Sequence, residues 1–198
     1  MNFIAHLLLS GNDDEIIIGN FIADSVKGSN YKKYPAGIQR GIFLHREIDS
    51  FTDAHEIVRR SKSRLSTVYG HYTGVLIDIF YDHILVKNWS KYSKQSLPDF
   101  AKKMYSILSN HKEIMPEDAQ YFLQYVLSND RINTYIKFEV IGSVLQGMAT
   151  RTKFISHMED AQSDLENNYN ELETDFNMFF PNLIDRIEEV KNSEKNTF

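Results

Sequence analysis

The stretch VLIDIFYDHILVKNW, residues 75–89, decides the fold because it is strongly apolar and yet carries ionisable groups. It contains no Gly or Pro and shows no strict alternation of apolar and polar residues, so a helix is favoured over a strand. Asp78 and Asp82 are four residues apart and therefore share one helix face, with His83 at its edge. Burying such groups among Ile, Leu and Phe is costly unless something compensates them. The stretch predicts an apolar helix whose polar groups need partners.

Apolar residues recur at helical spacing along most of the remaining chain. We expect helices over Phe3–Leu8, Ile16–Asp24, Pro35–Phe51, Glu56–Val68, Pro98–His111, Pro116–Leu127 and Phe138–Thr150, and a last one carrying the stripe from Leu165 to Ile187. No internal repeat, linker-like stretch or strand–helix alternation interrupts this pattern. The sequence therefore predicts an all-α fold, a multi-helix bundle in a single domain over residues 1–198, with residues 191–198 as a frayed C-terminal tail.

Composition narrows the class of protein. Of the 198 residues 42% are hydrophobic, including 13 Phe and 11 Tyr, which excludes a disordered chain. The absence of Cys excludes disulfides, thiolate metal sites and cysteine nucleophiles, and it suits a reducing compartment. No apolar run approaches the ~18 residues of a membrane span, and the first residues lack the pattern of a secretory signal. We expect a cytoplasmic protein without membrane contact, and the net charge of -5 argues against non-specific nucleic-acid binding.

A second pair of groups repeats the spacing of Asp78 and Asp82. His45 and Asp49 are four residues apart, so two such helices packed side by side could converge imidazole and carboxylate groups on one point. Asp24, at the end of another helix, could complete the set. Mixed His and Asp ligation without sulfur suits Mg²⁺, Mn²⁺ or non-haem iron better than structural zinc. The pattern indicates a divalent metal site with hydrolytic chemistry.

Each of these groups also has a plain structural interpretation. His45 and Asp49 could form an ordinary intrahelical pair, and His83 could be a hydrogen-bonded core histidine. The Asp78–Asp82 pair is harder to dismiss, because like charges at this spacing destabilise a helix unless a cation bridges them. His6, on the core side of the first helix, is interpreted as structural.

Basic residues gather between residues 27 and 64. Arg59, Arg60, Lys62 and Arg64 lie within six residues, as a solvated helix face or as a docking surface for an acidic protein, with Arg40 and Arg46 close in sequence. The sequence has no GxxxxGK[ST] phosphate loop, GxGxxG, HExxH or GxSxG motif. Nucleoside-triphosphate and serine-nucleophile chemistry therefore lose their usual support.

Several motifs in order resemble one known family. They are MNFIAHLLLS, GNFIADSVKG, GIFLHREIDSFTD, LIDIFYDHILVKNW, VLQGMATR and the FFP around Pro181. Together they resemble the acyl carrier protein phosphodiesterase family, from Met1 to about Pro181. That family is similar to a non-standard branch of the HD-domain metal phosphohydrolases, which implies an HD-domain-like all-α fold. The resemblance implies hydrolysis of the phosphodiester joining 4′-phosphopantetheine to a serine of holo-acyl carrier protein.

The resemblance also implies a site and a cofactor, Mn²⁺ or Mg²⁺ or another divalent metal. We expect four metal ligands, two groups that orient water or accept its proton, and five arginines that contact phosphate or the acidic carrier protein. These are Asp24, His45, Asp82 and His83 as ligands, Asp78 and Asp49 as catalytic groups, and Arg46, Arg59, Arg60, Arg64 and Arg151 for substrate or partner binding. In LIDIFYDH the aspartate precedes the histidine, the reverse of the usual His-Asp doublet.

Two other functions fit the residues. One is an HD-like phosphohydrolase acting on a nucleotide or another small phosphodiester. The other is a non-catalytic helical module that binds an acidic protein and uses its His/Asp cluster for stability only.

Overall fold

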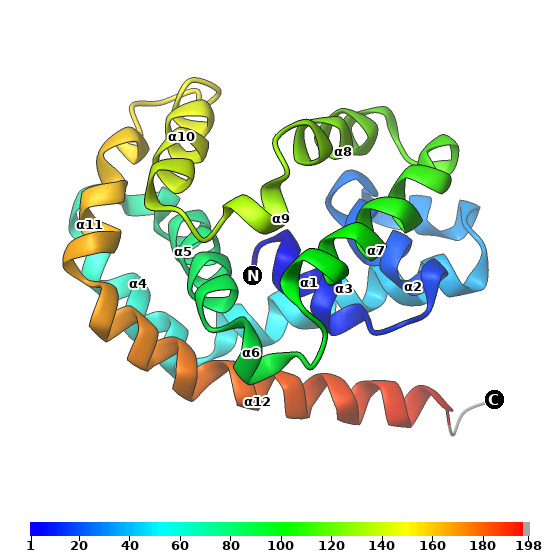
Figure 1. The fold of residues 1–198 in the computed structure, drawn as a ribbon. Coiled ribbons are helices and arrows are strands. Elements are labelled where there is room, and N and C mark those ends of the chain that lie inside the picture. Colours follow the sequence, from blue (N-terminus) through cyan, green and yellow to red (C-terminus); the bar gives the residue numbers. More distant parts are fainter. Residues whose placement is uncertain (196–198) are drawn as a thin grey trace.

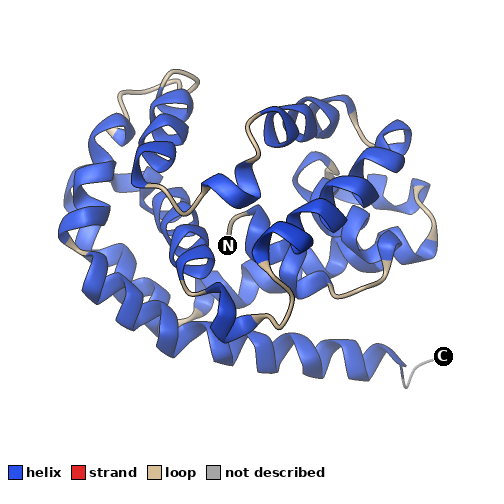
Figure 2. Cartoon of the chain, viewed as in Figure 1, coloured by secondary structure: helices blue, strands red, loops and turns tan. Residues whose placement is uncertain are grey.

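The computed structural model describes residues 1–195, and every regular element in that range is a helix (Figures 1 and 2). This confirms the predicted all-α single-domain bundle. The α-helices are α1 (Phe3–Ser10), α2 (Asp14–Ile22), α3 (Ala36–Ala54), α4 (Glu56–Tyr69), α5 (Thr73–Lys87), α6 (Trp89–Tyr92), α7 (Leu97–Asn110), α8 (Glu117–Ser128), α9 (Arg131–Thr134), α10 (Phe138–Ala149), α11 (Ala161–Asn167) and α12 (Tyr169–Lys195). Short 3₁₀ turns join them: η1 (Ala23–Ser25), η2 (Gly28–Lys33), η3 (Gly70–Tyr72), η4 (Lys112–Ile114) and η5 (Met158–Asp160).

Several expected boundaries differ from the structure by one to three residues. The last expected helix, with the stripe from Leu165 to Ile187, is divided into α11 and α12 at Asn168, where the backbone leaves the helical conformation. The apolar helix α5 ends at Lys87 rather than Trp89, because the backbone of Asn88 departs from the helix and its Nδ2 donates to the backbone oxygen of Ile84 at 3.1 Å. At the C-terminus the helix continues through residues 191–195, where fraying was expected, and residues 196–198 of that expected tail lie outside the described residues. Within the described chain, no helix combines the length and apolarity that crossing a membrane requires.

Helix α5 lies at the centre of the bundle. Its side chains from Ile79 to Val86 are buried on all sides, which explains why its sequence shows no polar face. The long helix α12 packs along α3, α4 and α5 and supplies an aromatic layer against Tyr81, formed by Phe176 and Phe179 (Figure 1). This packing fixes α5 relative to the N-terminal helices.

Helices α2 and α3 touch backbone to backbone. A Cβ atom on Gly19 would lie 2.1 Å from the carbonyl oxygen of Ile38, and one on Gly41 would lie 2.3 Å from that of Ile16. Only glycine permits this approach, because neither backbone oxygen can move aside. The close contact brings the residue after Gly19, Asn20, against His45 of α3.

Candidate metal centre

Two histidines and one aspartate converge where α1 meets α3. The Nε2 atom of His6 lies 3.1 Å from Asp49 Oδ1, and that of His45 lies 3.0 Å from Asp49 Oδ2. The two imidazole rings stack, with centroids 4.0 Å apart and an angle of 19° between their planes. One ligand atom from each of the three residues falls within 4.8 Å of the other two, a spacing that a single metal ion could bridge.

Asn20 sets the orientation of both rings. Its Oδ1 lies 2.9 Å from His6 Nδ1 and 3.0 Å from His45 Nδ1, and its backbone oxygen lies 2.9 Å from the same His45 nitrogen. Its Nδ2 donates to the backbone oxygen of His6 and to Ser10 Oγ, which fixes which end of the amide is oxygen. Both histidines therefore carry their N–H on Nδ1, as metal-ligating histidines commonly do when the other nitrogen is the ligand.

The remaining ring nitrogens face only acceptors. His6 Nε2 lies 3.0 Å from the backbone oxygen of Met1 and 3.1 Å from Asp49 Oδ1. His45 Nε2 is buried and, among the described residues, has no hydrogen-bond partner of acceptable geometry, although carboxylates of Asp24 and Asp49 lie within 3.4 Å. In neutral rings these nitrogens present lone pairs to oxygen lone pairs, an arrangement that a cation between them would relieve. The donor set thus fits a divalent metal ion.

The charges of the cluster agree with this fit. Burial lowers the pKa of His6 to about 4, which keeps its ring neutral. Burial opposes protonation of His45 as well, but the Asp24 and Asp49 carboxylates outweigh it and raise the pKa of His45 to about 9. Bonding to His45 lowers the pKa of Asp24, so that carboxylate is ionised at neutral pH. A cation entering the cluster would replace the His45 proton.

The other predicted site aspartates lie at different distances from the cluster. Asp24, on η1, is exposed and lies 3.4 Å from His45 Nε2, at the edge of the cluster. Asp78 is linked to the cluster through the N-terminal amine. Its Oδ1 lies 3.1 Å from the amine nitrogen of Met1, and that nitrogen lies 3.5 Å from Asp49 Oδ1. Burial raises the pKa of Asp78.

The structure does not bring Asp82 and His83 into the cluster. Both carboxylate oxygens of Asp82 accept hydrogen bonds from the first amides of α1, from Ile4 at 2.7 Å and Ala5 at 3.1 Å. Asp82 thereby caps α1 from a neighbouring helix and satisfies donors that no carbonyl of α1 can reach. His83 is fully buried, and its Nδ1 lies 2.7 Å from the backbone oxygen of Tyr135. These contacts compensate Asp82 without a metal, whereas the buried Nε2 of His83 has no hydrogen-bond partner among the described residues.

Sequence reasoning missed His6 and Asn20. His6 lies far from His45 in sequence, and no spacing rule links residues on different helices. One signal in the sequence pointed to His6: it is an ionisable residue on an apolar helix, and no ionisable partner lies three or four residues away on that helix. Asn20 carried no such signal, because its role depends on the glycine contact between α2 and α3.

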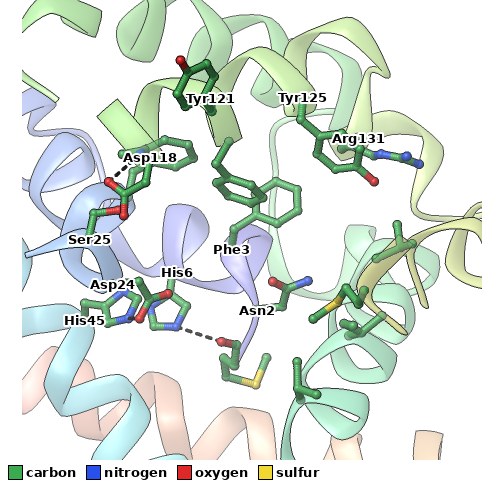
Figure 3. A pocket seen from close by; sticks show the side chains of 18 of the residues that line it. Asn2, Phe3, His6, Asp24, Ser25, His45, Asp118, Tyr121, Tyr125 and Arg131 are labelled. Carbon is green, nitrogen blue, oxygen red and sulfur yellow. Dashed lines mark hydrogen bonds and ion pairs between the residues drawn. The ribbon is translucent and has the colours of Figure 1, made fainter. Parts of the chain in front are cut away.

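A pocket of about 590 Å³ opens beside the cluster, and His6, His45 and Asp24 lie in its wall (Figure 3). The rest of the wall includes five aromatic side chains, Phe3 from α1, Phe21 from α2, Phe122 and Tyr125 from α8, and Tyr135 just after α9. Two arginines line it as well. Arg131 is buried with its guanidinium 4.5 Å from the Tyr125 ring centroid, and Arg151 is exposed at the end of α10.

The predicted partner-binding arginines divide into two groups. Arg60 and Arg64 of α4 both bond to Asp175 of α12, a carboxylate that is 1% exposed, and Ser61 Oγ donates to the same group. These two arginines therefore hold α4 to α12. Arg46 is exposed and carries no carboxylate partner within residues 1–195; the side chain of Arg59 is also exposed.

Comparisons with known proteins identify the family of the chain. The family model described as acyl carrier protein phosphodiesterase matches residues 1–183. Curated proteins with that name include one from Serratia proteamaculans, 30% identical over 96% of this chain and 98% of the relative. One from Photorhabdus laumondii is 32% identical over 95% and 96%, and one from Escherichia coli is 31% identical over 94% and 97%. No solved structure matches significantly, so the predicted HD-domain-like relationship stays a prediction. The chain belongs to the acyl carrier protein phosphodiesterase family.

Proposed function

We propose that this chain is a metal-dependent phosphodiesterase that hydrolyses the diester joining 4′-phosphopantetheine to a serine of holo-acyl carrier protein, releasing the apo carrier protein. The observation that carries the proposal is the pair of stacked imidazoles whose free nitrogens converge with Asp49 beside the pocket. Membership of the family gives the substrate class. A nucleotide or other small diester has no comparable support.

In this proposal His6, His45 and Asp49 hold the metal, with Asp24 as a further ligand or neighbour. The donor set of imidazole and carboxylate without sulfur favours Mn²⁺ or Mg²⁺. When bound, such a cation lowers the pKa of a water molecule and neutralises phosphodiester charge. Asp82 is left out of the ligand set because backbone amides already occupy both of its carboxylate oxygens. His83 is left out because it does not belong to the group of ligand atoms that His6, His45 and Asp49 form.

The reaction needs one proton transfer on each side of phosphorus. The water oxygen bonds to phosphorus, and the bond from phosphorus to the serine oxygen breaks. Asp24 is ionised, exposed and in the pocket wall, so its carboxylate is placed to accept the proton of the attacking water and return it to the serine oxygen. Asn20 keeps both imidazole rings in register during this transfer.

The pocket suits the prosthetic arm. A pantetheine arm is a chain of alkyl and amide groups, and the aromatic wall offers apolar surface with the polar side chains of Asn2 and Arg131 at its margin. Arg151, at the same wall, is free to meet phosphate charge, since no carboxylate pairs with it in the described part of the chain. A cytoplasmic location follows from this substrate and from the absence of Cys.

Intact-mass spectrometry tests the proposal. Purified protein is incubated with holo-acyl carrier protein and Mn²⁺, and we expect the carrier protein to lose the mass of its phosphopantetheine group. The His45→Ala variant and a chelated sample are expected to leave the holo form intact. A carrier protein that keeps its full mass in the complete reaction would refute the assignment.

A further inference from the structure

A run of the sequence next to the metal centre is basic without interruption. Residues 25–46 contain five cations and no Asp or Glu. Four of these cations are exposed, and none forms an ion pair with a residue in the range 1–195. We call them the η2 basic surface; they are Lys27, Lys32, Lys33 and Arg46. Unpaired cations gathered in one segment create a field that attracts an anionic partner.

The surface has a fixed shape. The guanidinium of Arg46 lies 5.5 Å from the ring centroid of Tyr31 and 5.7 Å from that of Phe43. These two rings contact each other at 4.8 Å, and the Phe43 side chain is 42% exposed. An arginine stacked on an exposed aromatic ring, as Arg46 is here, is typical of protein-binding surfaces, where aromatic residues and Arg are enriched.

The η2 basic surface adjoins the catalytic pocket. Arg46 directly follows His45, and its Nη2 donates to the backbone oxygen of Val26 at 3.4 Å. The residue before Val26, Ser25, lines the pocket. The surface therefore borders the pocket at η1.

The cations of α4 are differently placed. Arg60 and Arg64 hold the buried Asp175, and Lys62 Nζ lies 2.7 Å from Asp53 Oδ1. Arg60 and Arg64 lie along α12, and none of these three cations lines the pocket. In the proposed reaction phosphorus is joined to the serine of the carrier protein by a single oxygen. The carrier protein surface must therefore meet the enzyme at the edge of the metal centre, where the η2 basic surface lies.

We propose that the η2 basic surface docks an acidic surface of the carrier protein surrounding its modified serine. This inference rests on the proposed function, and it assigns the docking contact to η2 and α3 instead of α4. Electrostatic docking of this kind acts mainly on the association rate and weakens with salt.

Steady-state kinetics with holo-acyl carrier protein and Mn²⁺ test the docking surface. The double variant Lys32→Glu/Lys33→Glu is compared with a matched control, Lys91→Glu/Lys94→Glu, which changes the charge equally on exposed residues at α6. Arg59→Glu tests α4. We expect kcat/KM to fall by about tenfold or more in the η2 variant, mainly through KM, and to lose much of its salt dependence. The α6 and α4 variants should keep a kcat/KM close to that of the unmodified protein.

Bis(4-nitrophenyl) phosphate, a diester without a carrier protein, separates docking from damage to the site. We expect the loss on carrier protein to exceed any loss on this diester at least tenfold. Equal losses on both substrates, equal effects of the η2 and α6 variants, or a loss confined to Arg59→Glu would each overturn the inference. Failure of the unmodified protein to convert holo carrier protein would instead refute the proposed function.

Discussion

The replacement Asn20→Ala tests whether the Asn20 side chain orients both imidazole rings. Asn20 Oδ1 is the only side-chain acceptor in the described structure that both Nδ1 atoms share, at 2.9 Å and 3.0 Å. After truncation His45 keeps the backbone oxygen of residue 20 at 2.9 Å, whereas His6 loses its Nδ1 partner altogether. The change therefore frees one ring of the pair and leaves the other in place.

The magnitude follows from the bonds that are lost. Four side-chain hydrogen bonds disappear, two from the histidines and two to His6 O and Ser10 Oγ. At about 1 kcal/mol each, the free energy of unfolding should fall by about 4 kcal/mol. Loss of a group that orients a metal ligand commonly costs about 10- to 100-fold in metal affinity, and we expect Mn²⁺ affinity to fall by that amount.

Urea unfolding measures the first effect, and Mn²⁺ titration calorimetry measures the second. Ser10→Ala is the matched control, because it removes the bond from Asn20 Nδ2 and the bond from Ser10 Oγ to the backbone oxygen of His6, while the contacts of both imidazole rings stay intact. It should cost about 2 kcal/mol of stability and leave Mn²⁺ affinity within about twofold. If Asn20→Ala is destabilised as expected but binds Mn²⁺ as tightly as the Ser10 control, Asn20 does not orient the ligands.

Four further outcomes follow from the structure. Asp82→Asn removes one of the two bonds that cap α1. It should lower the free energy of unfolding in urea by about 1–2 kcal/mol without changing Mn²⁺ stoichiometry. Loss of bound Mn²⁺ would restore Asp82 as a ligand. Gly41→Ala places a Cβ 2.3 Å from a backbone oxygen, which should cause about 1–3 kcal/mol of strain. We therefore expect a lower thermal midpoint together with weaker Mn²⁺ binding. A variant of full stability would contradict the close α2–α3 contact. Asp175→Asn weakens the charge-assisted bonds to Arg60 and Arg64 and should lower the free energy of unfolding by about 1.5–3 kcal/mol. KM for holo carrier protein should stay constant. A raised KM would indicate that α4 belongs to the docking surface. The pKa of His45 is raised to about 9, so Mn²⁺ must displace a proton from this ring. Mn²⁺ affinity should therefore rise by up to about tenfold per pH unit between pH 7 and 8.5. Calorimetry that shows no change over that range would count against His45 as a ligand.

The sequence predicted the helices well because their apolar residues recur at a spacing that one helix alone determines. Local contacts such as the cap of α2, where the Asp13 side chain accepts from the Ile16 amide, also lie within one segment of the chain. The sequence could not predict how helices pair, since that depends on contacts such as Gly19 against Ile38. The proposed metal centre, with Asn20 of α2 against His45 of α3, is built across such a contact, which is why only part of it was visible in the sequence.

The buried residues Asp82 and His83 show the limit of arguing from apolar surroundings. Their burial was predicted correctly, and burial does demand compensation. For Asp82 the compensation comes from the amides at the start of α1, and burial still raises its pKa to about 7. A buried aspartate that caps another helix and one that binds metal look the same in a sequence. Only the position of α1 distinguishes them.

Counting bound Mn²⁺ by electron paramagnetic resonance in two single variants tests the central claim most directly. The claim is that His6, with His45 and Asp49, holds the metal, and that His83 does not. Both variants are first checked for native helicity by circular dichroism. We predict that His6→Ala binds no Mn²⁺ at concentrations that saturate the unmodified protein, whereas His83→Ala binds it with unchanged stoichiometry. Retained binding in His6→Ala together with loss in His83→Ala would contradict the account.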